Sequence, residues 1–255
     1  MSTPLTAGLI VIGNEVLSGR TQDANIRFLA QGLGALGLPL REVRIIPDVA
    51  PTIIATVNEM RASHAHVFTT GGIGPTHDDI TSECIAAAFG VPWEPHPEAM
   101  RMLGAHYSEG AFNTARRRMA TMPRGATLIE NDVSPAPGFT IGNVHVMAGV
   151  PRIMQSMFRT LAPRLPRGQP VVSSSVHAMP MLEGAIAEGL GTIQADFPML
   201  DLGSYPFERD GRYGVTLVAK GVDTAAVAAA IARVRGLIIS AGFTPIDGEP
   251  TEGRS

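Results

Sequence analysis

The sequence predicts an α/β fold in three layers, with helices on both faces of a mostly parallel sheet, followed by a small α+β domain. Three segments of strand length lie at residues 7–12, 40–46 and 65–68, of which the first and the last are apolar runs, and segments of helical periodicity separate them. This alternation favours parallel strands, because a crossover helix is needed to bring each strand back in the same direction. The first predicted domain spans residues 1–165.

The helices between these strands have recognisable starts. Asp23 is suited to N-cap a helix that runs to about Leu36, and Pro51 stands in the favoured first turn of the next one. A third helix is predicted over residues 82–89. Residues 131–139 are rich in turn formers and are predicted as a loop. The remaining predicted elements of this domain are helices at 98–107, 112–119 and 152–161 and strands at 127–129 and 144–147.

A proline-rich stretch marks the expected domain boundary. Four prolines and glycines stand within residues 163–170, a composition that is typical of a linker. The second predicted domain, residues 171–255, is a small α+β unit. Its predicted elements are an extended segment at 170–179, a helix at 182–194, a strand at 213–221, an alanine-rich helix from Asp223 to Ala241 and an edge strand at 243–246.

Composition excludes several classes of protein. The 255 residues carry a formal net charge of -3, so nothing global indicates a nucleic-acid partner or an anionic membrane surface. The only cysteine, Cys84, excludes an internal disulfide and a cysteine-based zinc site, and we expect it to be a packed thiol rather than a nucleophile. We find no signal peptide and no membrane-spanning run, and a reducing cytoplasmic location fits.

The stretch of residues 69–81 is the first candidate site. It follows a predicted strand and precedes a predicted helix, and it contains Gly71, Gly72 and Gly74. Glycines let the backbone approach a ligand closely, and their N–H groups can point at phosphate oxygens. Asp78 and Asp79 arrive as the helix begins and could serve a metal or a water. A tight turn with an N-cap aspartate is the alternative interpretation.

Other strand ends supply further carboxylates. Glu15 follows the first predicted strand and Asp48 follows the second. Because parallel strands end at the same edge of a sheet, these loops and the glycine turn predict a shared acidic pocket. The arginines at 116–118 are interpreted either as a solvated helix face or as a source of one phosphate-binding guanidinium. His77 is interpreted as a surface histidine or as an acid.

Several motifs resemble one known family. Residues 71–81 (Gly-Gly-Ile-Gly-Pro-Thr-His-Asp-Asp-Ile-Thr) are similar to the signature of the molybdenum-cofactor-biosynthesis domain, the MoaB/Mog-type molybdopterin-binding family. Residues 12–19, Asn25, 136–139 and 149–151 resemble its CinA-like (competence/damage-inducible protein A) subgroup. The resemblance runs from about Leu5 to Leu161, and residues 202–206 resemble the KH-type-like domain that follows in that group. No stretch resembles the deamidase domain of longer members, so deamidase activity is not expected.

The resemblance implies a ligand that contains a pyrophosphate. In the CinA-like branch it implies metal-dependent hydrolysis of ADP-ribose or a related dinucleotide such as FAD. The alternatives are a molybdopterin-binding protein or molybdopterin adenylyltransferase, with molybdopterin as ligand, and a non-catalytic nucleotide-sensing module. Asn14 stands where many relatives have an acidic residue, and this departure favours the sensing module.

The resemblance also implies roles for individual residues. Asp79 and Asp48 are expected to hold or orient a divalent metal (Mg, Mn or Co) and a water, with Asp78 or Glu15 in support. Gly71, Gly72 and Gly74 are expected to bind phosphate. The remaining expected ligand-binding residues are Thr81, Glu15, Ser18, Gly19, Asn25, Gly138, Gly149 and Pro151. A homo-oligomer, dimer or trimer, is expected, with no nucleic acid and no membrane as partner.

Overall fold

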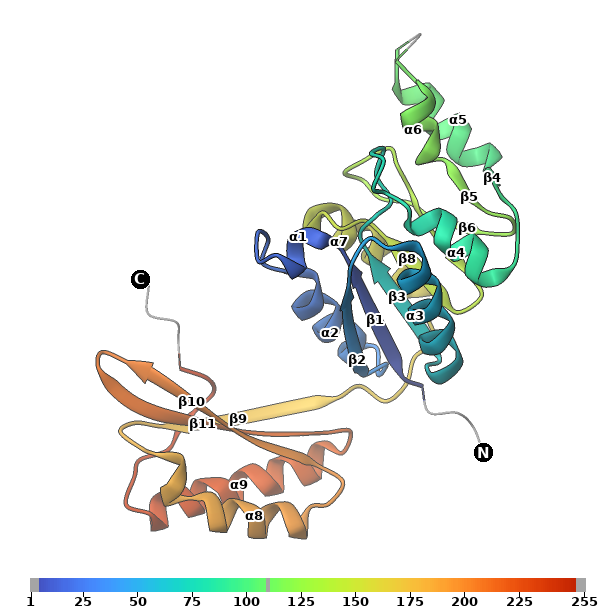
Figure 1. Ribbon diagram of the computed structural model, residues 1–255. Helices are drawn as coiled ribbons and strands as arrows, with labels where there is room; N and C mark the ends of the chain where they lie inside the picture. The colour runs from blue at the N-terminus through green and yellow to red at the C-terminus, as the bar shows by residue number, and fades with distance from the viewer. Residues whose placement is uncertain (1–4, 109–110, 251–255) are drawn as a thin grey trace. The chain divides into compact units, whose positions relative to one another are not determined.

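The chain divides into two compact units, Met1–Gly168 and Gln169–Ser255. The structure is a computed structural model that describes residues 5–108 and 111–250 (Figure 1). Each unit is described by itself. No helix in the described ranges is long and apolar enough to cross a membrane.

A six-stranded sheet forms the centre of the first unit. Its order is β2-β1-β3-β8-β7-β6, in which β2, β1, β3 and β8 pair in parallel, β7 runs antiparallel to β8, and β6 runs antiparallel to β7. The prediction of a mostly parallel sheet is therefore confirmed. The strands are β1 (Ala7–Ile12), β2 (Leu40–Ile46), β3 (His66–Thr70), β6 (Thr127–Ile129), β7 (Gly138–Ile141) and β8 (Val144–Met147).

Helices cover both faces of this sheet (Figure 1). In β1, Ile10 and Ile12 pack on the face covered by α3 and α4, whereas Leu9 and Val11 pack on the face covered by α2 and α7. Burial of each such side chain contributes about 1.5–3 kcal/mol, so the central strand is stabilised from both sides. The helices of these layers are α2 (Asn25–Ala35), α3 (Ala50–Ser63), α4 (Thr81–Phe89) and α7 (Pro151–Leu161).

Shorter elements complete the first unit. The predicted helix 112–119 is shorter in the structure, and two strands that the sequence did not predict form a small antiparallel pair, β4 with β5. These elements are α1 (Asn14–Leu17), β4 (Trp93–Pro95), α5 (Pro97–His106), α6 (Thr114–Arg118), β5 (Thr121–Pro123) and the 3-10 helix η1 (Ala162–Arg164).

Two details correct the sequence analysis. The N-cap of α2 is Ala24 rather than Asp23, although the Asp23 carboxylate still accepts a hydrogen bond from the N–H of Ile26 at 2.7 Å. The predicted loop 131–139 ends earlier, because Gly138 already belongs to β7. A side chain at Gly138 would overlap the carbonyl oxygen of Val146 on β8. Glycine, which in the sequence suggests a turn, is therefore needed here inside a strand.

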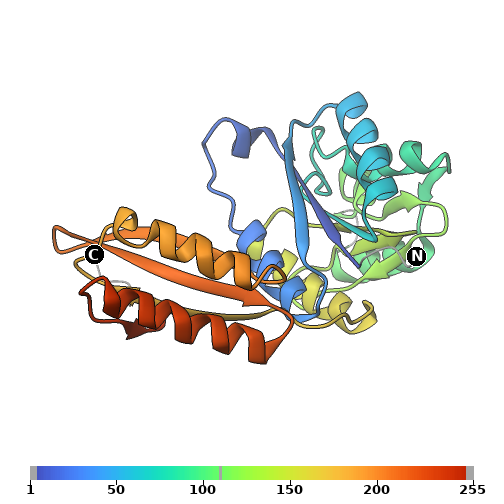
Figure 2. The same ribbon diagram turned by 90° about the horizontal axis from the view of Figure 1, so that it is seen from below.

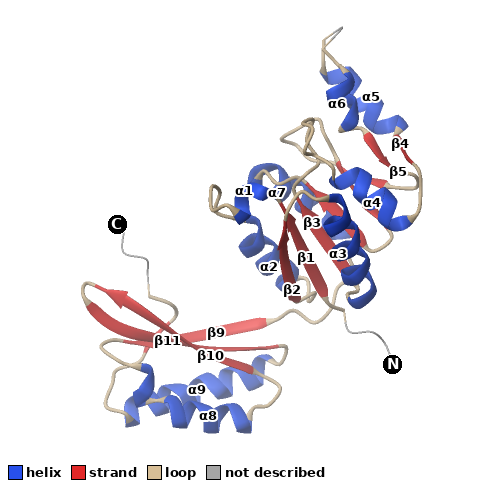
Figure 3. Ribbon diagram, viewed as in Figure 1, coloured by secondary structure: helices blue, strands red, loops and turns tan. Residues whose placement is uncertain are grey.

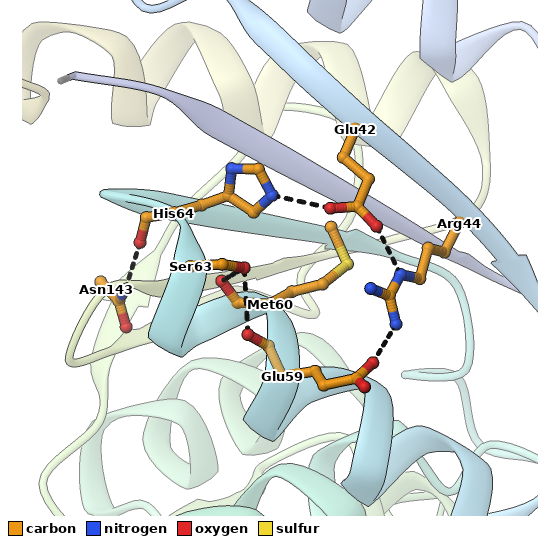
Figure 4. Close-up of polar contacts among 7 residues, drawn as sticks. All are labelled: Glu42, Arg44, Glu59, Met60, Ser63, His64 and Asn143. Carbon is orange, nitrogen blue, oxygen red and sulfur yellow. Dashed lines mark hydrogen bonds and ion pairs between the residues drawn. The ribbon is translucent and has the colours of Figure 1, made fainter.

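A polar network ties the edge strand β2 to α3 (Figure 4). Glu42 accepts from Arg44 Nε at 2.6 Å and contacts His64 Nε2 at 3.0 Å, and Arg44 also pairs with Glu59. These contacts lower the pKa of Glu42, with His64 the largest cause and Arg44 the next. The network holds a strand that has only one sheet neighbour.

The second unit is a four-stranded antiparallel sheet of order β10-β11-β9-β12, with both helices on one face (Figures 1 and 3). Seen from below, α8 and α9 run side by side (Figure 2). Asp223 caps α9 as predicted, by accepting from the N–H groups of Ala225 and Ala226. The elements are β9 (Val172–Ala178), η2 (Glu183–Ala185), α8 (Ala187–Asp196), β10 (Asp201–Arg209), β11 (Arg212–Gly221), α9 (Thr224–Ser240) and β12 (Ile246–Asp247).

Candidate functional site

A pocket of about 560 Å³ opens at the carboxyl ends of β1, β3 and β8. The loops that follow these three strands supply most of its wall. Ligands bind at this edge in open α/β sheets, because loops from several parallel strands converge there. The lining residues are Glu15, Thr21, Gly71, Gly72, Ile73, Gly74, Pro75, Asp79, Met119, Ser134, Ala136, Ala148, Gly149, Val150, Pro151, Ile153 and Met157.

The glycine turn is built so that only glycine fits. Gly71 and Gly72 have φ values of 105° and 66°, in the region that L side chains rarely adopt. A Cβ at Gly71 would overlap the carbonyl oxygen of Ile12, and one at Gly72 would overlap the Thr81 hydroxyl. At Gly74 a Cβ would lie 2.6 Å from the Asp79 carboxylate. The turn therefore presents bare backbone to the pocket.

A second loop packs directly against this turn. A Cβ at Gly149 would lie 3.2 Å from the Cα of Gly71, so the two backbones are in contact. The buried side chain of Asn25 donates from Nδ2 to the carbonyl oxygen of Gly149 at 2.8 Å. Asn25 thus ties the start of α2 to the loop after β8. It lines a smaller recess that shares Glu15, Thr21, Gly149 and Pro151 with the pocket.

The four predicted carboxylates divide into two pairs. Glu15 and Asp79 line the pocket, and Asp48 and Asp78 do not. Asp79 accepts from the Thr76 N–H at 2.8 Å and from the Thr76 hydroxyl, which closes the turn. Asp48 accepts from the Asn14 N–H at 2.9 Å. Asp48 also lies close enough to Glu15 and Asp78 for their negative charges to act on its carboxylate.

The two carboxylates outside the pocket wall have shifted pKa values. Burial raises the pKa of Asp48, and the negative charges of Glu15 and Asp78 add to the rise against the N–H of Asn14. Asp78 is fully exposed, and hydrogen bonding with Thr76 lowers its pKa. Of these two carboxylates, Asp48 is therefore the one that takes up a proton more readily.

Buried hydroxyl and amide oxygens around the site have no hydrogen-bond partner among the described residues. They are Thr70 Oγ1 at the end of β3, Thr81 Oγ1 at the start of α4 and Asn25 Oδ1. A buried polar atom without a partner costs about 1–3 kcal/mol, so such atoms mark places for a water or a ligand. Thr81 does not cap α4, since Ile80 holds that position, and its hydroxyl is turned toward Gly72.

The remaining predicted ligand-binding residues lie in different surroundings. Pro151 lines the pocket at the first turn of α7. Ser18 donates to the carbonyl oxygen of Glu15 at 3.2 Å, and Gly19 has a positive φ of 73° just after α1. Gly138 is buried in β7 and does not line the pocket. Cys84 is buried and its pKa is raised to about 11, chiefly by burial, which agrees with a packed thiol.

The arginines of α6 stack on aromatic rings. Arg116 lies 4.3 Å from the ring centre of Tyr107, and Arg118 lies 5.0 Å from that of Trp93. Arg118 also lies 3.7 Å from Glu83 and lines a narrow recess with Gly74 and Asp79. The interpretation as a solvated face is therefore incomplete, because these guanidinium groups pack on aromatic rings of the small lobe, the part of the first unit formed by β4, α5, α6 and β5.

Sequence reasoning missed part of the apolar wall. Met119, Ile153 and Met157 line the pocket beside the glycine turn. Ile153 and Met157 are four residues apart on α7, a spacing that could have placed both on one face. Met119 follows α6 and carried no signal, since the fold of the small lobe brings it to the pocket.

The side chains around the pocket limit how a metal could be held. Among residues 5–108 and 111–250, no three His, Cys, Asp or Glu side chains gather closely enough to hold an ion by themselves. Mg²⁺, however, is commonly held by one or two carboxylates together with waters and substrate phosphates. Glu15 and Asp79 in one pocket fit this second kind of site.

Comparison with known proteins follows the division into two units. Residues 8–167 match the family described as "probable molybdopterin binding domain", and residues 170–245 match the model described as "FAD synthase, middle domain". A protein of Archaeoglobus fulgidus is 32% identical over 78% of this chain and 84% of its own length.

CinA-like proteins are also among the relatives. One from Parasynechococcus marenigrum is 35% identical over 60% of this chain, which spans only 38% of that relative's length. The crystal structure described as the protein CinA with unknown function from Thermoplasma acidophilum is 29% identical, with a TM-score of 0.61 over 64% of this chain and 99% of that one. The chain belongs to the molybdopterin-binding domain family of molybdenum-cofactor biosynthesis, with CinA-like proteins among its relatives.

Proposed function

We propose that the pocket binds a nucleotide or pterin pyrophosphate and that the protein hydrolyses the pyrophosphate of ADP-ribose, or of a related dinucleotide such as FAD, with a divalent metal. The observation that carries the proposal is the presence of bare glycine backbone and two carboxylates in the wall of one pocket. Phosphate oxygens need close N–H donors, and a hydrolytic site needs groups that handle charge and water.

Phosphate recognition is assigned to the glycine turn and its neighbour. Gly72 and Gly74 expose backbone on one side of the pocket, whereas the N–H of Gly71 donates to the carbonyl oxygen of Met147 at 3.2 Å and Gly149 packs against Gly71. The hydroxyl of Thr81 lies at Gly72, but Thr81 is fully buried and does not line the pocket, so we assign it no phosphate contact. The apolar side chains of Ile153 and Met157 suit the ring that a nucleotide or pterin carries.

A divalent ion (Mg, Mn or Co) would be held by carboxylates together with the ligand's phosphates. When bound it would neutralise phosphate charge and lower the pKa of a bound water. We assign Asp79 and Glu15, which both line the pocket, to holding the metal, and Asp48 and Asp78, which lie outside the pocket wall, to orienting these groups or the water. The raised pKa of Asp48 makes its carboxylate a better proton acceptor than an ordinary aspartate.

Molybdopterin binding is the second candidate function. The match of residues 8–167 to a probable molybdopterin-binding domain favours it, and a pterin pyrophosphate would use the same glycine turn. A protein that binds molybdopterin or transfers an adenylyl group to it, and a nucleotide-sensing module without turnover, therefore remain the competing proposals.

Product analysis separates these proposals. The protein is incubated with ADP-ribose, FAD or molybdopterin, each with Mg²⁺, Mn²⁺ or Co²⁺. We expect AMP to form from ADP-ribose or FAD only when the metal is present. Binding of a nucleotide without product would support the sensing module, and selective retention of a fluorescent pterin after purification would support the molybdopterin proposal.

A matched pair of variants tests the site. Asp79→Asn keeps an oxygen that can accept from the Thr76 N–H but removes the charge, so hydrolysis should fall about 100-fold or more while ADP-ribose still binds. Glu98→Gln, an exposed carboxylate on α5 outside the pocket, should leave hydrolysis unchanged. Full hydrolysis by Asp79→Asn would overturn the assignment of Asp79.

A further inference from the structure

The sheet of the second unit has one face that no described helix covers. Val215, Leu217 and Ala219 of β11 are buried beneath α8 and α9, so the alternate residues of this strand point to the opposite face. Register places Tyr205 opposite Thr216 and Asp201 opposite Lys220 on that face. Figures 1 and 3 show both helices on the other side.

Two aromatic rings on the uncovered face lie where glycines leave room for them. A Cβ at Gly203 would lie 2.8 Å from the ring of Tyr205, and a Cβ at Gly214 would overlap the ring of Phe207. The rings therefore lie against the backbone of β10 and β11. Tyr205 nevertheless remains 53% exposed, so part of its ring is free to contact a ligand.

These rings border a pocket of about 400 Å³. Its volume is in the lower range of small-molecule sites and suits a mononucleotide better than a dinucleotide. Thr216, Val218 and Lys220 of β11 also line it. Lys220 is the only lysine of the chain, and among the described residues no hydrogen bond or ion pair is formed by its ammonium group.

The segment after β12 closes one end of this pocket. Gly248 donates to the carbonyl oxygen of Ser175 at 3.0 Å, and its own carbonyl oxygen accepts from His177 Nδ1 at 2.7 Å. These bonds hold the following residue, Glu249, at the pocket wall. A carboxylate in such a position can accept from ribose hydroxyls, as acidic residues do in nucleotide sites.

Charge argues for a small ligand rather than a nucleic acid. Residues 169–255 contain ten acidic and six basic residues, and Lys220 is the basic residue in the pocket wall. Nucleic-acid surfaces need several cations in a row to follow the phosphates. One ammonium group beside two aromatic rings instead matches one base with one phosphate.

We propose that this face binds a nucleoside monophosphate, with the base against Tyr205 and Phe207, the ribose hydroxyls at Glu249 and the phosphate at Lys220. The site is separate from the pocket of the first unit and does not depend on the reaction proposed there.

The single lysine makes a direct test possible. The full-length protein is treated with an amine-acetylating reagent, with and without AMP, and acetylation of Lys220 is followed by mass spectrometry of its peptide. We expect AMP to slow acetylation at Lys220 but not at the N-terminal amine. Adenosine, which lacks the phosphate, and ribose 5-phosphate, which lacks the base, should each protect at least tenfold more weakly.

Two tyrosine variants provide a matched comparison. Tyr205→Ala should raise the AMP concentration for half-protection about tenfold, because base–aromatic stacking contributes to binding on this scale. Tyr213→Ala removes a tyrosine of similar exposure, 58%, from the other face, and should leave protection unchanged. Circular dichroism confirms that both variants fold.

The outcomes decide the proposal. Unchanged acetylation at millimolar AMP, equal protection by ribose 5-phosphate, or equal effects of the two tyrosine variants would each overturn it. Asp79→Asn is run in parallel and should retain full protection at Lys220. Protection of Lys220 by AMP would then persist even if the first unit does not hydrolyse ADP-ribose. A failure of the proposed AMP site can therefore be distinguished from a failure of the proposed hydrolysis.

Discussion

At the scale of single residues, the charged form of Asp48 is expected to lower the free energy of unfolding while it supports hydrolysis of ADP-ribose. Burial and neighbouring carboxylates raise its pKa, so its charged form is less stable in the folded protein than in the unfolded chain. Asp48→Asn removes that charge and keeps an oxygen that can accept from Asn14. We expect hydrolysis of ADP-ribose to fall about 100-fold or more, with no loss in the free energy of unfolding at pH 7.

The pH dependence of the wild type follows from the same shift. A carboxyl with a raised pKa is protonated earlier as the pH falls, so hydrolysis should decline on the acid side above the ordinary pKa of an aspartate. Steady-state rates from pH 4 to 8 measure this decline. If Asp48→Asn keeps the rate of the wild type, Asp48 has no part in the reaction.

A pair of histidines predicts acid sensitivity of the fold. His66 Nδ1 and His145 Nε2 lie 3.0 Å apart, which allows one shared proton but not two facing N–H groups. Burial lowers the pKa of His145 from 6.5 to about 3, with the charge of His66 a smaller cause. Because the folded-state pKa is the lower one, the stability from this group is complete above pH 6.5 and is lost as the pH falls toward 3.

The expected loss can be measured by urea unfolding. From pH 7 to pH 5 the free energy of unfolding of the first unit should fall by about 2 kcal/mol on account of His145. His145→Gln should flatten this dependence, whereas His106→Gln, a change at an exposed histidine, should not. Equal pH dependence in wild type and His145→Gln would show that the pair does not control acid stability.

At the scale of elements, the glycine turn between β3 and α4 is expected to tolerate no side chain. Gly72→Ala introduces both a strained φ of 66° and an overlap with Thr81. Gly125→Ala is the matched control, since its φ is 85° but a Cβ there meets nothing within 4 Å. Backbone strain alone costs about 1–2 kcal/mol, and the overlap should add about 1–3 kcal/mol at Gly72.

Two readouts distinguish these effects. Gly72→Ala should lower the urea midpoint more than Gly125→Ala and should also abolish ADP-ribose binding, which Gly125→Ala keeps. Binding by isothermal titration and unfolding by fluorescence supply the values. Equal losses of stability in the two variants would mean that the overlap of a Cβ at position 72 with the Thr81 hydroxyl does not lower the free energy of unfolding.

The elements that sequence predicts well are those with a strong local pattern. β1 is an apolar run, β2 mixes apolar with charged residues, and a glycine or proline follows each of β1, β2 and β3. Pro51 and Asp223 start helices for local reasons. The glycine turn is visible for the same reason, because its residue types are tied to its own backbone. Whether its neighbours form a metal site is a question of long-range geometry and stays a prediction.

The missed elements depend on partners far along the chain. β10 reads as polar and contains Pro206, which is tolerated because β10 is an edge strand. Its turn, Asp210-Gly211, with φ values of 50° and 71°, is a hairpin signal that sequence analysis overlooked. Met119 reaches the pocket only through the fold of the small lobe, and no local pattern indicates that.

At the scale of the whole molecule, the assembly state is still a prediction. The resemblance to the MoaB/Mog-type family predicts a dimer or trimer. Sedimentation at micromolar concentration tests this, and a single species with the mass of one chain would contradict it. The outcome matters for function, because an interface over either proposed site would change access to it.

The two units are expected to fold and work separately. The apolar clusters of the first unit lie within residues 7–165, and that of the second lies within residues 176–243, so neither core needs side chains from the other. The CinA structure from Thermoplasma acidophilum, covered over 99% of its length by 64% of this chain, agrees with a unit of about the first one's size folding by itself. A protein of residues 1–168 should therefore give the circular dichroism spectrum of a folded protein and should hydrolyse ADP-ribose at the rate of the full chain. A protein of residues 169–255 should show protection of Lys220 by AMP and should not hydrolyse ADP-ribose. If the first fragment is folded but loses hydrolysis, the reaction needs the second unit, and the pocket described above is only part of the active site.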